Sequence, residues 1–348
     1  MKLFQPLWRV VAPALILAAI ASPAAAQTTK VKFTLDWRYE APAAAFLVAL
    51  GKGYFEQEKL DVTIDSGSGS GMTITRVTSG AYEMGFADLG AVMEFVGNNP
   101  GAMQKPVSVM MIYNNTPSGI FALRKSGIKT PADLKGKTLG GPVFDAARRA
   151  FPVFAKANSI DLATTKWSAM DPAMRELMLV KGEVDAISGF VFYTPLALYA
   201  RGVKPEDLVV LPYAQYGVKL YGNSVIANDE WARKNPAVVK AMLRAIAKGF
   251  RDTIANPVEA ITYVKKRDPL IDDKLELARL KLLISQTLNS PDARAEGFGQ
   301  VSQPRVTLMA TQVSDAFNTK ARIDASTIFD ASYLPSRQEL DILPKAAK

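Results

Sequence analysis

The 348-residue chain contains no cysteine and no histidine. These two absences exclude a Ser-His-Asp triad, a Cys-His nucleophile and every metal site built on thiolate or imidazole ligands. They also exclude disulfides and a thiol redox pair. Any metal would need an all-oxygen site. The composition therefore leaves carboxylate, lysine or tyrosine chemistry, or a function without catalysis, and we expect neither a cofactor nor a metal.

A concentrated basic surface is also lacking, although 42 basic and 33 acidic residues give a formal net charge of +9. The densest basic run, Lys265-Lys266-Arg267, follows an apolar helical pattern and fits a solvated helix end. No basic stripe alternates with aromatic residues, which is the pattern typical of nucleic-acid binding. The charge pattern therefore predicts a solvated surface and no nucleic-acid partner.

The first 26 residues have the three parts of a secretory signal peptide. Lys2 and Arg9 form a basic start, Val10–Ala21 is apolar, and the small-residue tract Ser22–Ala26 ends in an A-x-A site. The apolar run is shorter than the roughly 20 residues that span a bilayer. We predict cleavage after Ala26 and a mature protein in the periplasm with no stable membrane anchor. The alternative is a buried N-terminal helix.

The remaining chain alternates strands with helices. Val31–Leu35 and Leu60–Ile64 show the period-two pattern of strands, and an apolar helix is predicted between them from Pro42 to Leu50. A second block restarts this order with a strand at Lys137–Gly140 and a helix from Phe144 to Ala157. Strands separated by single helices predict an α/β fold with mostly parallel sheets.

A weak internal repeat suggests two lobes. Gly182–Gly189 resembles Gly80–Ala87, because each has a helix-ending glycine, an acidic residue three positions later, and a strand ending in small residues. The stretches Asn114–Gly119 and Tyr216–Asn223 are the predicted crossing points between the lobes. The predicted organisation is a signal peptide over residues 1–26, a first lobe from residues 27–115 and 222–348, and a second lobe from residues 116–221.

Two motifs of the first lobe follow predicted strands, where ligands gather in open parallel sheets. In Asp36–Glu40, Trp37 and Tyr39 can stack on a flat ligand, and Arg38 or Glu40 can fix its polar groups. Gly67–Gly71 precedes a helix and fits a ligand-lining loop. It matches neither a phosphate-binding loop nor a dinucleotide fingerprint. The alternative for Asp36–Glu40 is a packed tryptophan with solvated charges.

Two further motifs lie in the second lobe. Gly140-Gly141-Pro142, followed by Asp145 and Arg148, permits close approach of a ligand to a helix N-terminus. Phe190, Phe192 and Tyr193 follow a strand and either face a cleft or belong to the core. Together with residues near strand ends and crossings, these motifs give the predicted ligand-binding set: Trp37, Arg38, Tyr39, Glu40, Ser68, Gly69, Ser70, Asp88, Tyr113, Asn114, Gly141, Asp145, Arg148, Phe190, Tyr193 and Tyr221. Sequence spacing singles out no catalytic pair.

Several segments, taken in order, resemble the periplasmic solute-binding proteins of ABC importers. The branch that they resemble groups nitrate, sulfonate and taurine binders with thiamine-pyrimidine binders (the SsuA/THI5-like and NMT1-like proteins). The segments that carry the resemblance are Leu35-Asp36-Trp37, Ala49 with Gly51–Phe55, Leu60-Asp61-Val62, Gly80 with Gly85–Asp88, Pro131–Lys137, and Gly182–Ala186.

The resemblance implies a type II binding-protein fold with two α/β lobes, two crossover segments and a ligand held between the lobes. It further implies hinge closure, recognition of the closed form by the transmembrane subunits of a permease, and a monomer. Leu-Asp-Trp is most similar to the thiamine-pyrimidine binders, which continue with Pro-Asn and a histidine. Here Arg38–Pro42 follow instead. The related pyrimidine synthases need histidines and a cysteine-rich motif, so the resemblance implies no synthase activity.

The sequence thus favours a non-enzymatic importer subunit for a small polar nutrient, with a pyrimidine-like or other nitrogen heterocycle as the first hypothesis. An alkanesulfonate, taurine or nitrate-type anion is the second, because of the net charge and the two glycine-rich junctions. A periplasmic hydrolase that uses carboxylates is the third.

Overall fold

Alternating apolar residues build a first five-stranded sheet. The computed structural model describes residues 1–2 and 28–344, so the predicted signal peptide lies outside the described residues except for its first two positions. The strand order is β2-β1-β3-β10-β4. The strands are β1 (Thr29–Thr34), β2 (Leu60–Asp65), β3 (Met84–Asp88), β4 (Pro106–Met111) and β10 (Asn223–Asn228).

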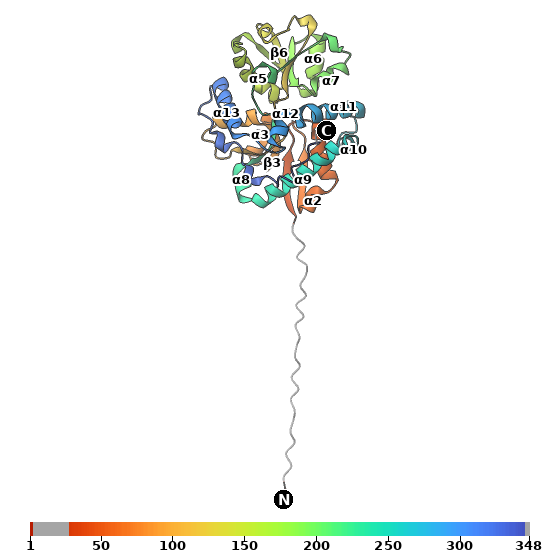
Figure 1. Cartoon of the computed structure of the whole chain (residues 1–348), viewed down its shortest axis with the longest axis vertical. Helices are drawn as coiled ribbons and strands as arrows, with labels where there is room; N and C mark the ends of the chain where they lie inside the picture. Colours follow the sequence, from red (N-terminus) through yellow and green to blue (C-terminus); the bar gives the residue numbers. More distant parts are fainter. Residues whose placement is uncertain (3–27, 345–348) are drawn as a thin grey trace.

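Ten helices surround this sheet in lobe 1, the lower lobe of Figure 1. The central pair is α1 with α9, which begins at Pro236 as its Asn-Pro start predicts and ends before Asn256. Gly249 allows this close packing, since a Cβ there would lie 2.2 Å from the Ala45 carbonyl oxygen. The helices are α1 (Ala44–Gly51), α2 (Tyr54–Gln57), α3 (Ser70–Thr78), α4 (Leu89–Asn98), α8 (Asp229–Lys234), α9 (Pro236–Ala255), α10 (Pro257–Arg267), α11 (Asp273–Leu282), α12 (Pro291–Glu296) and α13 (Gln303–Phe317).

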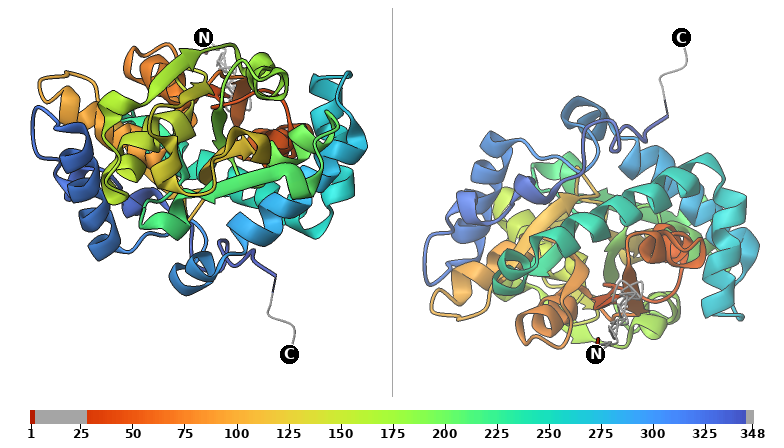
Figure 2. Two further views of the ribbon diagram at one scale, coloured as in Figure 1. Left: turned by 90° about the horizontal axis from the view of Figure 1, so that it is seen from above. Right: turned by 90° about the horizontal axis from the view of Figure 1, so that it is seen from below.

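Lobe 2, the upper lobe of Figure 1, contains a second five-stranded sheet in the order β7-β6-β8-β5-β9. Its strands are β5 (Ser118–Leu123), β6 (Thr138–Gly141), β7 (Lys166–Ala169), β8 (Ala186–Phe190) and β9 (Leu208–Pro212). Three helices flank it: α5 (Ala146–Ala157), α6 (Arg175–Lys181) and α7 (Thr194–Tyr199). The views from above and below in Figure 2 show both lobes wrapped in helices.

The two sheets have the same plan, as the internal repeat suggested. β3 and β8, the two strands of the repeat, both occupy the third position of their sheets. The glycines that precede them, Gly80 and Gly182, have φ angles of +75° and +77° and end the preceding helices in the left-handed region that favours glycine. The sequence similarity therefore marks equivalent places in the two lobes.

Each sheet contains one strand that runs against the others. β10 is antiparallel to β3 and β4, and β5 is antiparallel to β8 and β9. Each of these strands follows a crossover from the other lobe. Residues 213–222 lead into β10, and residues 112–117 lead into β5. Each crossover joins strands of different sheets, β4 to β5 and β9 to β10, whereas parallel neighbours within one sheet are joined by a long connection, usually a helix. The prediction of two mostly parallel sheets with two crossovers is confirmed, with this one exception in each sheet.

An aromatic chain links the lobe 1 core to the cleft between the lobes. Phe46 contacts Phe86, Phe86 contacts Tyr113, and Tyr113 contacts Phe192 of lobe 2, with ring centroids 5.0, 5.4 and 6.0 Å apart. All four rings are buried. These buried rings connect the core of lobe 1 with the wall of the cleft.

Over residues 28–344, no helix combines the length and the apolar character needed to cross a bilayer.

Candidate functional site

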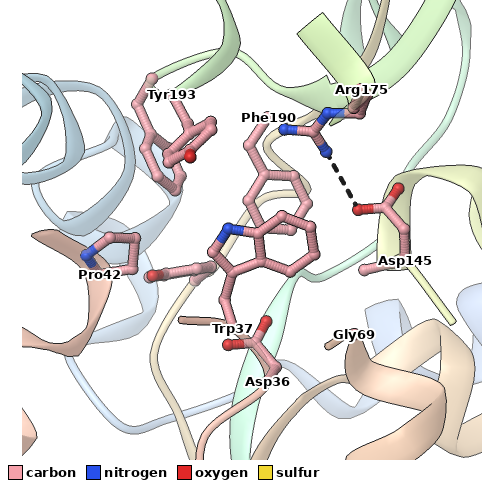
Figure 3. A pocket seen from close by; sticks show the side chains of 11 residues that line it. Asp36, Trp37, Pro42, Gly69, Asp145, Arg175, Phe190 and Tyr193 are labelled. Carbon is pink, nitrogen blue, oxygen red and sulfur yellow. Dashed lines mark hydrogen bonds and ion pairs between the residues drawn. The ribbon is translucent and has the colours of Figure 1, made fainter. Parts of the chain in front are cut away.

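A cavity between the lobes, called the binding cavity below, lies at the carboxyl ends of strands from both sheets. It contains about 440 Å³ of empty space, part of it open to solvent. Lobe 1 contributes residues that follow β1, β2 and β4, and lobe 2 contributes residues that follow β6, β7 and β8. The lining residues are Asp36, Trp37, Pro42, Gly69, Tyr113, Asp145, Ala146, Arg175, Phe190, Phe192 and Tyr193 (Figure 3).

The indole of Trp37 lies at the centre of this cavity (Figure 3). Its ring meets Tyr193 of lobe 2 edge to face, with centroids 6.5 Å apart. The guanidinium carbon of Arg175 lies 5.3 Å from the Trp37 ring and 5.7 Å from the Tyr193 ring. Phe190 and Phe192 complete the apolar wall. Such an arrangement of aromatic faces suits a flat, unsaturated ligand.

Arg175 is buried at the start of α6, and two carboxylates compensate its charge. Its Nε and Nη2 donate to Glu176 Oε1 at 3.0 and 2.7 Å, and its Nη1 lies 3.5 Å from Asp145 Oδ2. Asp145 and Glu176 are buried as well. Arg175 therefore lines the cavity as a side chain whose charge is compensated by two carboxylates, and not as a free cation.

Asp36 is a buried carboxyl of lobe 1 that lines the same cavity. Burial raises its pKa to about 7, against the effect of the hydrogen bond that Asn223 Nδ2 donates to Oδ2 at 2.6 Å. Asp88, at the end of β3, is also buried, and burial raises its pKa to about 7. Nearby Asp145 acts in the same direction on both groups. Asp36 thus holds or releases a proton near neutral pH at the cavity wall.

These shifted carboxyls predict a pH dependence of stability. Between the unfolded pKa near 3.9 and the folded value of about 7, the folded chain binds more protons than the unfolded chain. We therefore expect the free energy of unfolding to fall as the pH rises through this window, by roughly 1.4 kcal/mol per pH unit for each carboxyl. Urea unfolding at about pH 5 and about pH 7.5 measures the change.

Asp88→Asn is the variant that isolates one carboxyl, because asparagine keeps the capping acceptor of α4 without titrating. It should reduce the pH dependence and leave one of the two contributions in place. An Asp88→Asn protein with the full pH dependence would contradict this explanation.

Helix N-termini near the cavity are occupied by the chain itself. Asp145 Oδ1 accepts from the Arg148 amide at the start of α5, and Asp88 Oδ1 accepts from the Ala91 amide at the start of α4. At the start of α3, the Gly71 amide donates to the Phe144 carbonyl oxygen of lobe 2. The glycine-rich junctions that suggested an anion site are thus closed by carboxylates and a carbonyl.

The binding cavity brings together six of the sixteen predicted ligand-binding residues: Trp37, Gly69, Tyr113, Asp145, Phe190 and Tyr193. They come from both lobes and from five different strand ends, which agrees with the rule that ligands gather there.

Ten predicted residues lie outside this cavity, and each has another contact or place. Tyr39 donates to the Ile64 carbonyl and lies under Arg267, whereas Glu40 faces Arg38 and Arg279. Arg148 donates to the Gly141 carbonyl and lies 4.9 Å from the Trp167 ring.

Three of the ten support loops and crossovers through hydrogen bonds, and a fourth lies in a loop. Ser70 Oγ accepts from the Asp88 amide. Asn114 and Tyr221 both donate to Glu296 near the two crossovers. Ser68 is half-buried in the loop before α3 and does not line the cavity.

Five lining residues were absent from the predicted set: Asp36, Pro42, Ala146, Arg175 and Phe192. Asp36 and Phe192 are direct neighbours of the predicted residues Trp37 and Tyr193 and follow the same strands. Arg175 begins a helix directly after the 3-10 helix Pro172–Met174, and nothing in its local pattern distinguishes it from a surface arginine. Only its buried contacts with Asp145 and Glu176 reveal its place.

The lobes contact each other on both sides of the binding cavity. On one side, Arg149 Nη2 of α5 lies 2.6 Å from Glu94 Oε2 of α4. On the other, the Arg279 guanidinium carbon of α11 lies 3.9 Å from the Tyr193 ring centroid. Charged side chains thus connect the two lobes at more than one place.

Two α/β lobes, two crossovers and a cavity at the strand ends define the periplasmic binding protein fold. The alkanesulfonate-binding protein SsuA from Xanthomonas axonopodis pv. citri, in a structure bound to MOPS, superposes with a TM-score of 0.68 at 14% identity. The match covers 88% of this chain and 99% of that chain.

The chain belongs to the NMT1/THI5-like family, whose sequence model matches residues 41–260. The riboflavin-binding protein RibY of Chloroflexus aurantiacus is 25% identical over 252 residues, covering 70% of this chain and 68% of RibY. The formylaminopyrimidine-binding protein of Halalkalibacterium halodurans is 26% identical over 267 residues, covering 74% of this chain and 78% of that protein. Another relative of this chain has the name of an enzyme. The 4-amino-5-hydroxymethyl-2-methylpyrimidine phosphate synthase THI13 of Saccharomyces cerevisiae is 27% identical over 256 residues, covering 67% of this chain and 69% of that protein.

Proposed function

We propose that this chain is the extracytoplasmic solute-binding subunit of an ABC importer and captures a small nitrogen heterocycle between its lobes. In this proposal the mature protein begins after Ala26, acts in the periplasm as a monomer, and delivers its ligand to the transmembrane subunits of a permease. Trp37, Tyr113, Asp145, Phe190 and Tyr193 contact the ligand. The names of the riboflavin-binding and formylaminopyrimidine-binding relatives support this ligand class.

The observation that carries the proposal is the pairing of aromatic faces with carboxyl groups in one cavity. Trp37 and Tyr193 offer stacking surfaces from opposite lobes. Asp36 and Asp145 offer hydrogen-bond acceptors from opposite lobes. Ring N–H and amino groups of a heterocycle match such acceptors, and a hydrogen bond to a charged group contributes about 1.5–3 kcal/mol.

An anionic ligand is the less favoured alternative. A sulfonate or nitrate needs an uncompensated cation or free backbone amides. Here Glu176 and Asp145 compensate Arg175, and the starts of α3, α4 and α5 are occupied. The ionised Asp36 carboxylate would also repel an anion. The net charge of the chain therefore does not describe the charge of its cavity.

A thermal-shift screen tests the ligand class. Purified mature protein is heated with pyrimidines, flavins, sulfonates, taurine, nitrate and aromatic acids, and positive hits are quantified by calorimetry. A ligand that binds only the folded state raises the melting temperature, and the shift grows with the logarithm of its concentration above Kd. Shifts with heterocycles support the proposal, and shifts with anions alone would overturn it. Turnover of a bound compound, followed by chromatography, would favour an enzyme such as a carboxylate-based hydrolase.

Closure of the lobes depends on Gly69, and this gives a specific prediction. A Cβ at Gly69 would lie 2.2 Å from the Phe144 carbonyl oxygen across the lobe boundary, and the φ angle is +132°. Because the clash is with backbone, no rotamer change relieves it. Gly69→Ala should hold the lobes apart and weaken ligand binding at least about tenfold, or about 1.4 kcal/mol.

Gly101→Ala is the matched control, since a Cβ there meets nothing within 4 Å. Calorimetry on both variants, with small-angle scattering in the presence of ligand, measures affinity and closure. Full affinity in Gly69→Ala would show that contact between this loop and Phe144 is not part of the bound state.

A further inference from the structure

A second cavity lies between the lobes next to the binding cavity, and Tyr193 lines both. It contains about 750 Å³ of empty space, part of it open to solvent. Lobe 1 contributes the segment after β1 and the region around α11. Lobe 2 contributes the segment before α6, the start of α6 and residues on either side of α7. The two cavities are thus neighbouring compartments of one cleft.

The second cavity is lined mainly by charged side chains, whereas aromatic side chains dominate the wall of the binding cavity. Five carboxylates and three guanidinium groups line it. Because Glu176 already pairs with Arg175, the lining keeps an excess of one negative charge. Glu40, Glu176, Glu276 and Arg279 are buried among them. Glu40 and Arg38, which the sequence placed at the ligand, line this compartment and not the aromatic one.

Two side-chain atoms of residues that line this compartment are buried and have no hydrogen-bond partner within the described part of the chain. They are Glu40 Oε2 and Arg279 Nε, on residues that are 6% and 4% exposed. The Oε1 atom of Glu40 has only long contacts, 3.7 Å to Arg38 and 3.8 Å to Arg279. Unpaired buried polar atoms are costly, so such groups point to a missing partner.

We propose that the ligand is bipartite, with a heteroaromatic head beside Trp37 and a polar tail that passes Tyr193 into the second cavity. This inference rests on the proposed function for its head group. The negative excess selects a tail that carries hydroxyl or amino groups and disfavours a tail that carries a phosphate or carboxylate. The tail's donors pair with Glu40 Oε2, and its acceptors pair with Arg279 Nε.

Two series of compounds with one head and different tails test the proposal. The flavin series is lumichrome, riboflavin and flavin mononucleotide, and the pyrimidine series is cytosine, cytidine and cytidine monophosphate. Calorimetry on the mature protein should show that the hydroxylated compound binds at least about tenfold more tightly than the bare head in a series whose head binds. The added phosphate should reduce that gain.

Glu40→Gln removes one carboxylate charge without changing the shape of the side chain. It should weaken binding of the hydroxylated compound severalfold and leave the bare head unaffected. Glu58→Gln, at a pair with Arg244 on the outer side of lobe 1, is the control for loss of a paired carboxylate. Binding of bare heads with no gain from any tail would overturn the bipartite ligand and leave the proposed function intact. Binding of no heterocycle in either series would overturn the proposed function itself.

Discussion

Trp37→Ala should weaken heterocycle binding about 30-fold, equivalent to roughly 2 kcal/mol, because stacking on one aromatic side chain contributes about 1–3 kcal/mol. The indole lies at the centre of the binding cavity, and the Tyr193 ring is nearly perpendicular to it, so Tyr193 does not present a face parallel to the indole. Trp37→Phe should keep most of the affinity. Calorimetry with the tightest heterocycle from the thermal-shift screen measures the change.

Trp231→Ala provides the control for this experiment. Trp231 is also a half-buried tryptophan of lobe 1, at the start of α8, and it does not line the binding cavity. Its removal should cost some stability and no affinity. Equal affinity in Trp37→Ala and the native protein would remove stacking on this residue from the mechanism of binding.

Arg175→Met should lower the free energy of unfolding by about 3 kcal/mol or more, because it leaves buried carboxylates without their cation. Glu176 and Asp145 are 3% and 5% exposed, so water cannot replace the guanidinium. Urea unfolding gives the free energy. Calorimetry on the folded fraction then shows whether the cavity still binds its ligand.

A second substitution separates the electrostatic effect from the loss of packing. Arg175→Met with Glu176→Leu removes both members of the closest pair and should restore most of the lost stability. Arg244→Met, at a pair whose side chains are 36% and 15% exposed, should cost less than about 1 kcal/mol. A double variant no more stable than Arg175→Met alone would refute the paired-charge explanation.

Local sequence patterns predicted the fold well because they report on local structure. The alternation in Val31–Leu35 marks β1, the Asn-Pro start marks α9, and the glycine-acid repeat marks β3 and β8. The antiparallel direction of β5 and β10 was not predicted. It depends on which sheet the chain enters after a crossover, and that choice is made by packing between distant segments.

The site followed the same division. Trp37, Gly69 and Phe190 were predicted because strand ends in a parallel sheet point to one edge. Arg38 and Glu40 were predicted from the same strand end, but Glu40 contacts Arg38 and Arg279 instead of lining the binding cavity. Arg279 lies about 240 residues further along the chain. Arg175 escaped prediction because its burial depends on Asp145 and Glu176 as partners. The ion pair between Arg175 and Asp145 forms only in the folded chain, so the local sequence around Arg175 does not indicate it.

The path of the chain through the two sheets has a consequence for the order of folding. All five strands of lobe 2 lie within residues 118–212, so this lobe has every strand it needs in one continuous stretch. Lobe 1 does not, because β4 joins its sheet only through β10, which begins at Asn223. Pairing of such distant strands is slow, since a long loop must close first. As the chain is synthesised from its N-terminus, lobe 2 can therefore be complete before lobe 1 has β10, the strand that joins β4 to the rest of its sheet.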